Sequence, residues 1–375
     1  MTAHGNRSQN TTGEQPTSGT AVADHTVEPV SSGFSAPSFT ICVDTLGGDN
    51  APAVVMDALG QILASDSPFD RCINLLLTGF ASDIQPLANA HPQRVVAVPT
   101  SQRIEMDEHP ATAVKQKRDS SIVVGAKLLR SGQADAFFSS GSTGAIMAAA
   151  TLFVGRIKGV KRPAIATLIP APKGHVLLLD AGANSEVEPE YLLQFAHMGS
   201  IYAAKALGIA RPRLALLNVG AEASKGSRPI QAAYELLQLH VDNFYGNAEG
   251  DDLFSGRFDV IVSGGFTGNV VLKAMEGAVS GLLSELKKLF MASHKNKVAA
   301  ALIKKDLMAL KDQLDIDLIG GAPLLGLNKS VVIGHGSAGA LAIANGIRQA
   351  ARMAQGNVPQ LIAASLAVDA DDKTH

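Results

Sequence analysis

From residue 39 onward, short apolar runs that end in Gly, Asp or Asn alternate with segments of helical period. This alternation restricts the fold more than any other feature, because it is typical of a mostly parallel β-sheet wrapped by α-helices. In these runs apolar residues do not alternate with polar ones, as they do in a sheet with one solvent-exposed face. We therefore expect strands that are buried on both faces. The predicted strands are FTICVD, INLLLTG, RVVAVP, DAFFSSG, AIATLIP, HVLLLDAG, RLALLNVG, VIVSGG and SVVIGHG. The sequence therefore predicts a doubly wound α/β fold.

The composition predicts one large domain with an extension at each end. Of the 375 residues, 46% are hydrophobic, which suffices for a single α/β domain over residues 39–360. Residues 1–38 contain little that packs and lack the apolar core of a signal peptide, so we predict a disordered N-terminal extension. Residues 361–375 are expected to form a C-terminal tail. No run approaches the roughly 20 apolar residues of a membrane-spanning helix, so we do not expect membrane insertion.

Several classes of site lack support in the sequence. The net charge of -2 argues against a nucleic-acid partner. Cys42 and Cys72 lie in apolar runs, as reduced core thiols of a cytosolic protein do. The chain has no P-loop, dinucleotide fingerprint or H-E-x-x-H motif, so we expect no nucleotide cofactor and no metal. GSTGA does not follow the G-x-S-x-G pattern, so a covalent acyl-enzyme has no obvious nucleophile.

Six predicted strand ends combine glycine with polar residues. Ligands of doubly wound sheets bind outside the carboxyl ends of the strands, and glycine-rich turns with free backbone amides bind anions. Each turn alone is also typical of an ordinary capped strand-to-helix connection. Together they favour one shared anion or phosphate site at one sheet edge. The turns are DTLGGDN (44–50), SSGSTG (139–144), DAGAN (180–184), NVGAEASKG (218–226), GGFTGN (264–269) and GHGSAG (334–339).

Further segments carry a family resemblance: VDTLGGDNAP, EHPATAVKQKRDSS, GRIKGVKRPA, LLLDAGAN, YLLQFAHMGSIYA, GFTGNVVLKAMEG and GGAPLLGLN. In this order they resemble the bacterial phosphate acyltransferase family over about residues 39–353. The resemblance implies transfer of a long-chain fatty acyl group from acyl carrier protein to inorganic phosphate in phospholipid synthesis. It also implies a homodimer and a fold similar to those of phosphate acetyltransferases and isocitrate-type dehydrogenases.

The chain departs from the family pattern in four of the turns. Gly264 and Gly339 stand where the family usually has aspartate, and Ser263 stands where it has cysteine. SSGSTG replaces S-A-G-N-T-G, and NVGAEASKG lacks two of the three acids of N-x-G-E-E-E-x-K-G. Two alternatives therefore stay open. One is a catalytically silent relative that binds the carrier protein or lipid, and the other is a phosphate acetyltransferase-type enzyme that uses acyl coenzyme A.

The implied reaction selects candidate site residues from these turns. Lys225 and Lys273 are expected to contact phosphate, Asn269 to donate a hydrogen bond, and His335 to bind phosphate or steady the leaving thiolate. The lysines are alternatively solvated surface residues, and His335 a strand-end residue satisfied by backbone groups. The expected substrate-binding residues are Asp44, Gly47, Gly48, Asp49, His109, Ser139, Ser140, Gly141, Ser142, Thr143, Gly144, Asp180, Asn184, Asn218, Thr267 and Gly268.

Two kinds of residue in this set carry alternatives of their own. His109 precedes the KQKRDSS run, where the acyl-pantetheine arm or the carrier protein is expected to dock, although it equally suits a plain turn. Two roles stay open for the three aspartates Asp44, Asp49 and Asp180. They either contact the substrate or hold their own turns by hydrogen bonds to the backbone.

Residues 279–314 predict a basic amphipathic hairpin of two helices. Apolar residues recur there at helical spacing and lysines outnumber acids. Such a hairpin binds an anionic membrane surface or docks the acidic carrier protein, and the alternative is a dimer or core helix pair. The prediction is a cytoplasmic enzyme that associates peripherally with the membrane.

Overall fold

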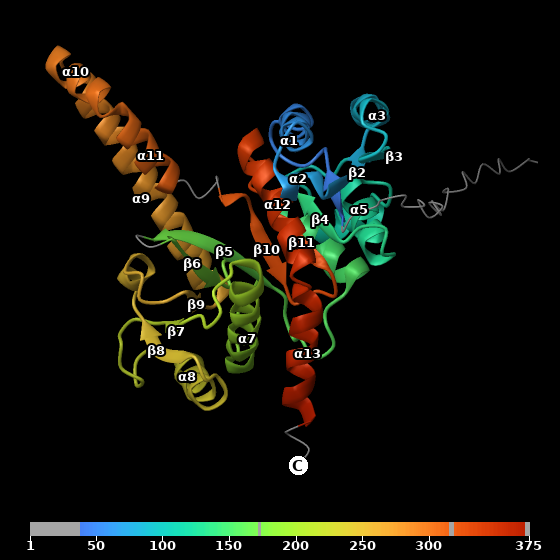
Figure 1. The fold of residues 1–375 in the computed structure, drawn as a ribbon. Coiled ribbons are helices and arrows are strands. Elements are labelled where there is room, and N and C mark those ends of the chain that lie inside the picture. Colours follow the sequence, from blue (N-terminus) through green and yellow to red (C-terminus); the bar gives the residue numbers. More distant parts are fainter. Residues whose placement is uncertain (1–37, 172–173, 315–318, 372–375) are drawn as a thin grey trace, which may run out of the picture. The chain divides into compact units, whose positions relative to one another are not determined.

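The computed structural model describes residues 38–171, 174–314 and 319–371. Within these ranges one sheet has the strand order β3-β2-β1-β4-β11-β10-β5-β6-β9-β7-β8 (Figure 1). Its strands are β1 (Phe39–Asp44), β2 (Ile73–Gly79), β3 (Val95–Pro99), β4 (Ala136–Ser139), β5 (Ala164–Ala171), β6 (Gly174–Leu179), β7 (Leu214–Leu217), β8 (Phe244–Ala248), β9 (Val260–Val262), β10 (Ala322–Leu325) and β11 (Ser330–Ile333).

The sheet consists of two parallel halves that run in opposite directions. Strands β3, β2, β1, β4 and β11 are mutually parallel, as are β6, β9, β7 and β8. Between the halves, β10 pairs antiparallel with β11 and with β5, and β5 pairs antiparallel with β6. The predicted mostly parallel, doubly wound sheet is therefore confirmed.

Helices cover both faces of the first half. Phe137 and Phe138 are neighbours in β4, so their rings point to opposite faces. A Cβ built on Gly125 would lie 2.4 Å from the Phe137 ring, and one on Gly346 would lie 2.2 Å from the Phe138 ring. Helices α5 (Ser121–Arg130) and α12 (Ala340–Gln355), which carry these glycines, therefore lie on opposite faces of β4.

The remaining helices follow the strands along the chain. They are α1 (Ala53–Leu63), α2 (Pro68–Arg71), α3 (Ala81–Ala90), α4 (Pro110–Gln116), α6 (Thr143–Ala149), η1 (Ala150–Val154), α7 (Pro189–Ala206), α8 (Arg228–His240), η2 (Gly250–Phe254), α9 (Gly265–Met291), α10 (His294–Leu302), α11 (Lys304–Leu314) and α13 (Val358–Asp371).

All nine predicted strands are present, and β8 and β10 are additional. Strand β8 (FYGNA) is partly exposed and contains Gly246 and Asn247, so it lacks the apolar run of the other strands. Strand β10 (APLL) is short and contains Pro323. Neither has the composition from which a buried parallel strand is predicted.

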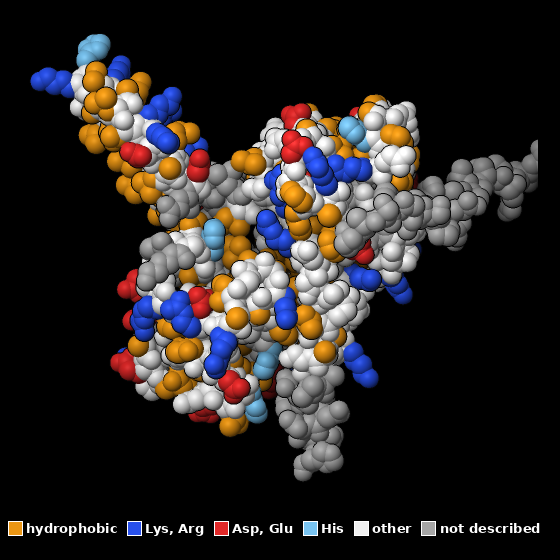
Figure 2. Space-filling model, viewed as in Figure 1, with side chains coloured by type: hydrophobic (Ala, Val, Ile, Leu, Met, Phe, Trp, Pro, Cys, Tyr) orange, Lys and Arg blue, Asp and Glu red, His pale blue; other side chains and the backbone are white. Residues whose placement is uncertain are grey.

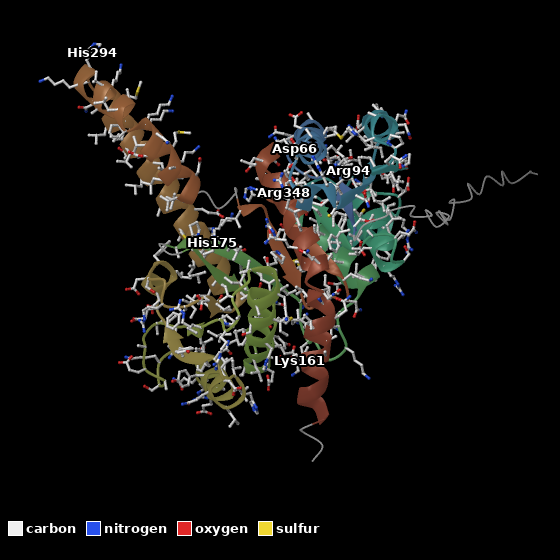
Figure 3. All side chains as sticks on the ribbon, viewed as in Figure 1. Asp66, Arg94, Lys161, His175, His294 and Arg348 are labelled. Atoms are coloured by element: carbon white, nitrogen blue, oxygen red, sulfur yellow. The ribbon has the colours of Figure 1, made fainter. Side chains whose placement is uncertain are left out.

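The predicted hairpin is present with different boundaries. Residues 279–291 are the second half of α9, which begins at Gly265, and α10 and α11 follow where one helix was expected. Hydrophobic side chains and lysines are interspersed along it (Figure 2), and His294 marks the start of α10 at its far end (Figure 3). In the described part of the chain, no helix is both long and apolar enough to cross a membrane.

The two predicted extensions have different outcomes. Residues 1–37 lie outside the described part of the chain, so the predicted disorder stays a prediction. Residues 361–371 belong to α13, in which Val358 and Ile362 are buried in the core, so the domain continues beyond the predicted boundary at residue 360. Burial of Val358 and Ile362 stabilises this helix against the core.

One ion pair ties α12 to the start of the first half. Arg348 donates two hydrogen bonds to the carboxylate of Asp70, each 2.9 Å long. Arg94, which lies on the same side of this half in Figure 3, donates to the Asp70 carbonyl at 2.6 Å. The pairing fixes α12, and with it the turn that precedes α12, against residues from the beginning of the domain.

Candidate active site

The turns after β1, β4 and β11 pack into one cluster. The hydroxyl of Ser139 donates to a carboxylate oxygen of Asp44 at 2.6 Å, and the amide of Gly334 donates to the Ser139 carbonyl at 2.8 Å. The amide of Asp49 donates to the carbonyl of Gly336 at 2.8 Å. Three of the six glycine-rich turns are thus connected directly by hydrogen bonds.

The turns after β6 and β9 form a second cluster. The carboxylate of Asp180 accepts hydrogen bonds from the amides of Gly182, Ala183 and Asn184 at 3.1, 2.9 and 2.9 Å. The hydroxyl of Ser263 donates to the Asp180 carbonyl at 3.0 Å. Asp180 and Asn184 therefore brace their own turn, which is the second of the two roles that the sequence left open for Asp180.

The sixth turn, residues 218–226 after β7, closes on itself. The Asn218 side chain donates to the Lys225 carbonyl at 3.1 Å and accepts from the Val219 amide at 2.8 Å. Asn247 of β8 donates to the Glu222 carbonyl at 2.9 Å. Asn218 and Lys225 therefore lie in a loop held by its own hydrogen bonds, next to the carboxyl end of β9, with which β7 pairs in parallel.

A cavity of about 210 Å³ lies where the two clusters face each other over β5 and β10. Four of the predicted site residues line it: Thr143, Asn269, Lys273 and His335. The clusters come from strands that run in opposite directions, so the expectation of a single sheet edge is wrong. The site forms at the seam between the two half-sheets instead.

Two hydrogen-bonded pairs set the charge of the cavity wall. Lys273 donates to a carboxylate oxygen of Glu276 at 2.8 Å, three residues further along α9. His335 Nδ1 lies 2.8 Å from the Ser337 hydroxyl and accepts from the Ser337 amide at 3.3 Å. Because a backbone amide only donates, this contact favours the tautomer that carries its proton on Nε2. His335 thus retains one N–H donor.

One carboxylate of each cluster is buried, Asp44 in the first and Asp180 in the second. Burial raises the pKa of the Asp44 carboxyl above its ordinary range, against the opposing effect of hydrogen bonds from Ser121 and Ser139. Burial likewise raises the pKa of Asp180, and the N–H donors of its turn act in the other direction. Neither carboxylate lines the cavity, so both act through the turns that they hold.

Several glycines at the site are required by packing between turns. A Cβ on Gly47 would lie 2.5 Å from the amide nitrogen of Gly141, and one on Gly268 would lie 2.0 Å from the carbonyl oxygen of Asp180. A Cβ on Gly144 would lie 2.5 Å from Pro110. Close contact between protein segments therefore explains these glycines without an anion. Gly48 additionally has φ of +110°, which favours glycine.

Helices α6, α9 and α12 begin beside the cavity without side-chain caps. Their N-cap residues are Ser142, Gly264 and Gly339, and within the described residues none of these makes a capping side-chain hydrogen bond. Gly264 and Gly339 are the positions at which the family resemblance implies aspartate. The structure gives this departure a physical meaning, since both missing carboxylates belong to helix N-caps.

The other predicted residues do not line the cavity. His109 is the N-cap residue of α4, with Nδ1 3.3 Å from the Thr112 hydroxyl. Thr267 is exposed in the first turn of α9. The hydroxyl of Ser140 is buried and has no hydrogen-bond partner among the described residues.

Part of the cavity lining comes from residues outside the predicted site. Glu276 was detectable as the acid three residues after Lys273, the spacing of a helical ion pair. Thr167 interrupts the apolar run of β5, and the pair Gly320 and Gly321 precedes β10. These residues gave only weak signals, because they depend on how β5 and β10 join the half-sheets. The described residues contain no group of three or more His, Cys, Asp or Glu side chains arranged to hold a metal ion.

Comparison with known proteins identifies close sequence relatives. The chain matches the family described as "Fatty acid synthesis protein" over residues 39–361. A phosphate acyltransferase of Heliobacterium modesticaldum is 48% identical over 321 residues, covering 84% of this chain and 94% of the relative. Phosphate acyltransferases of Brevibacillus brevis and Staphylococcus aureus are 44% and 41% identical, covering 87% and 85% of this chain and 97% and 96% of theirs.

Solved structures of similar fold are phosphotransacetylases. One from Streptococcus pyogenes has a TM-score of 0.57 at 18% identity, covering 85% of this chain and 94% of its own. EutD phosphotransacetylase from Staphylococcus aureus has a TM-score of 0.55 at 17% identity, covering 84% and 94%. At such low identity the similarity concerns the fold alone, and it confirms the predicted fold class.

Proposed function

Because the chain belongs to the phosphate acyltransferase family, we propose that its cavity transfers a long-chain fatty acyl group from acyl carrier protein to inorganic phosphate. The protein is an acyltransferase. The carrier-protein donor, the long chain and the use of acyl phosphate for glycerophospholipid synthesis are our proposal. One observation supports the location of the reaction above all others: Asn269, Lys273 and His335, from opposite half-sheets, line the same cavity.

The proposed reaction is direct attack of phosphate on the thioester. A phosphate oxygen forms a bond to the thioester carbonyl carbon, and the carbonyl oxygen becomes an oxyanion. The carbon–sulfur bond then breaks, and the thiolate leaves with the electron pair and takes up a proton. Because a thioester is already activated, holding both reactants and stabilising the oxyanion suffices, without an enzyme-bound intermediate. The proposal requires neither metal nor cofactor.

The cavity residues suit these steps. The Lys273 ammonium supplies positive charge for phosphate, and the Asn269 side chain supplies a hydrogen-bond donor. His335 has its Nε2–H free to donate to phosphate, to the oxyanion or to the leaving thiolate. The uncapped starts of α6, α9 and α12 add positive ends of helix dipoles. For Lys225 we propose only an indirect part, because it does not line the cavity.

We further propose a cytoplasmic homodimer that binds anionic membrane peripherally through the hairpin of α9, α10 and α11. The basic amphipathic composition of this segment supports the membrane contact. Its exposed leucines are consistent with either a lipid surface or a second copy.

The decisive assay measures free carrier protein released from palmitoyl-acyl carrier protein with and without phosphate. We expect release only with phosphate, and slower turnover with acetyl coenzyme A. Faster turnover with acetyl coenzyme A would identify a phosphate acetyltransferase-type enzyme. Binding of the palmitoylated carrier protein without any release would identify a catalytically silent relative.

A further inference from the structure

A second, larger cavity lies within the hairpin. It is a groove of about 1070 Å³ between the second half of α9 and the facing helices α10 and α11. The groove wall on α9 consists of Leu283, Leu286 and Phe290, and the opposite wall includes Ala300, Leu307 and Leu314. All six are partly buried by the helices themselves. The groove is thus an apolar channel along the length of the hairpin.

The groove adjoins the cavity of the proposed reaction site. Glu276 and His335 line both cavities. Glu276 is also the partner of Lys273, at 2.8 Å. An apolar group that leaves the reaction site past these two residues therefore enters the groove directly.

We propose that the groove binds the acyl chain of the substrate and of the acyl phosphate product, with the reacting carbonyl in the cavity beside His335. This inference rests on the proposed function and deepens it. Along α9, Glu276 and Met291 are separated by roughly 22 Å at about 1.5 Å per residue, which provides room for a long extended chain. Burial in the groove removes the chain from water, so binding strengthens as the chain lengthens.

The side chains at the groove rim are consistent with a lipid-like occupant. Lys287, Lys297, Lys304 and Lys311 contribute to the groove lining and are exposed. Lysines of this kind cover apolar surface with their methylene stems and keep their charges in water. The hairpin has a distinct second apolar set, which includes Leu282 at 59% exposure and lies outside the groove lining. The groove and the outer surface of the hairpin can therefore be tested separately.

The test blocks the groove with a large side chain and varies the chain length of the donor. Leu283→Trp fills the groove, and Leu282→Trp, at the adjacent position outside the lining, is the matched control. We expect Leu283→Trp to lower kcat/KM for palmitoyl-acyl carrier protein about tenfold or more and to change that for butyryl-acyl carrier protein less than about twofold. Leu282→Trp should keep the wild-type ratio of kcat/KM between the palmitoyl and butyryl donors. Ala300→Trp, from the opposite wall, should reproduce the chain-length effect.

The other outcomes overturn the proposal. Suppose that Leu283→Trp and Ala300→Trp are both folded by circular dichroism and keep the wild-type ratio of kcat/KM between the palmitoyl and butyryl donors. This result would show that the acyl chain lies elsewhere. A changed oligomeric state of these variants in light scattering, with an unchanged donor ratio, would make a second copy the occupant. Failure of the wild type to release carrier protein from either donor contradicts the proposed function itself, and is thereby distinguished from failure of this inference.

Discussion

At the scale of single residues, the cavity charge depends on the pair of Lys273 and Glu276. The ammonium and the carboxylate are 2.8 Å apart, so the lysine charge is largely balanced while the cavity is empty of anions. A phosphate ion that enters the cavity competes with Glu276 for the same N–H donors. For the proposed phosphate site, we therefore expect the acid to weaken phosphate binding and to keep the lysine in place.

The first prediction concerns the charge of Lys273. Lys273→Met removes a charged hydrogen bond worth about 1.5 to 3 kcal/mol, so the KM for phosphate should rise about tenfold or more. Lys288→Met is the control, because Lys288 forms the same type of pair with Glu285 on the same helix, outside both cavities. Steady-state kinetics at varied phosphate measures both. Equal phosphate KM values for the two variants would mean that Lys273 is a solvated surface lysine.

The second prediction concerns pH. The pKa of Asp44 is raised in the folded state, chiefly by burial, so the fold favours the protonated carboxyl. The stability that Asp44 contributes relative to Asp44→Asn should be greatest below the ordinary aspartate pKa and decline as pH rises through the raised one. Urea unfolding of both proteins at several pH values measures this difference. A difference that grows with pH would show instead that the folded state stabilises the Asp44 carboxylate.

At the scale of elements, the start of α12 connects stability with phosphate binding. Gly339 is an N-cap residue with no atom within 4 Å of a built Cβ, so an aspartate fits there. The carboxylate would cap the free amides and complement the helix dipole, which also fills the place where an anion would bind.

The third prediction follows from that cap. Gly339→Asp should raise the free energy of unfolding by about 0.5 kcal/mol and should also raise the KM for phosphate. Glu188→Asp, at the N-cap of α7 and outside the cavity lining, should affect stability alone. Thermal melting and phosphate kinetics check the pair of effects. A lower phosphate KM in Gly339→Asp would refute the idea that the free helix start attracts the anion.

The fourth prediction concerns the outer surface of the hairpin. Leu289 and Leu302 are 58% and 81% exposed and lie outside the groove lining. Replacing both with Glu should release the protein from anionic vesicles in flotation assays, and high salt should weaken wild-type binding because the lysine charges are screened. Leu239→Glu, at an exposed leucine of α8, is the control. Wild-type protein that never floats with the vesicles contradicts the membrane proposal.

The sequence predicted the helices and strands better than it predicted the order in which the strands pair. Buried runs such as INLLLTG identified strands directly, because each is fully buried in the sheet. The turn at residues 218–226 resembled the other five in composition, yet none of its residues lines the cavity. Whether Lys225 or Lys273 lines the site depends on strand order, which periodicity does not encode. Glu276 and Thr167 were missed for the same reason, since their role follows from the seam.

At the scale of the whole molecule, the described domain accounts for the family match without the first 38 residues. The match begins at residue 39, where β1 begins in the structure. The fifth prediction is that a chain starting at residue 39 keeps the melting temperature and the turnover of the full-length protein. Calorimetry and the carrier-protein release assay provide the comparison. A clear loss of either quantity would show that the extension contributes to the domain.

The strand order has a consequence for synthesis on the ribosome. Strands β10 and β11 are the last to be made, yet they lie in the middle of the sheet, between β4 and β5. While residues 322–333 are still inside the ribosome, the edges of β4 and β5 lack these partners, and α12 has not yet covered its face of β4. Nascent chains therefore expose open strand edges until nearly the whole sequence has emerged, the situation in which chaperones protect a protein from aggregation. A premature stop before residue 322 would remove the centre of the sheet and would leave two half-sheets that no strand connects.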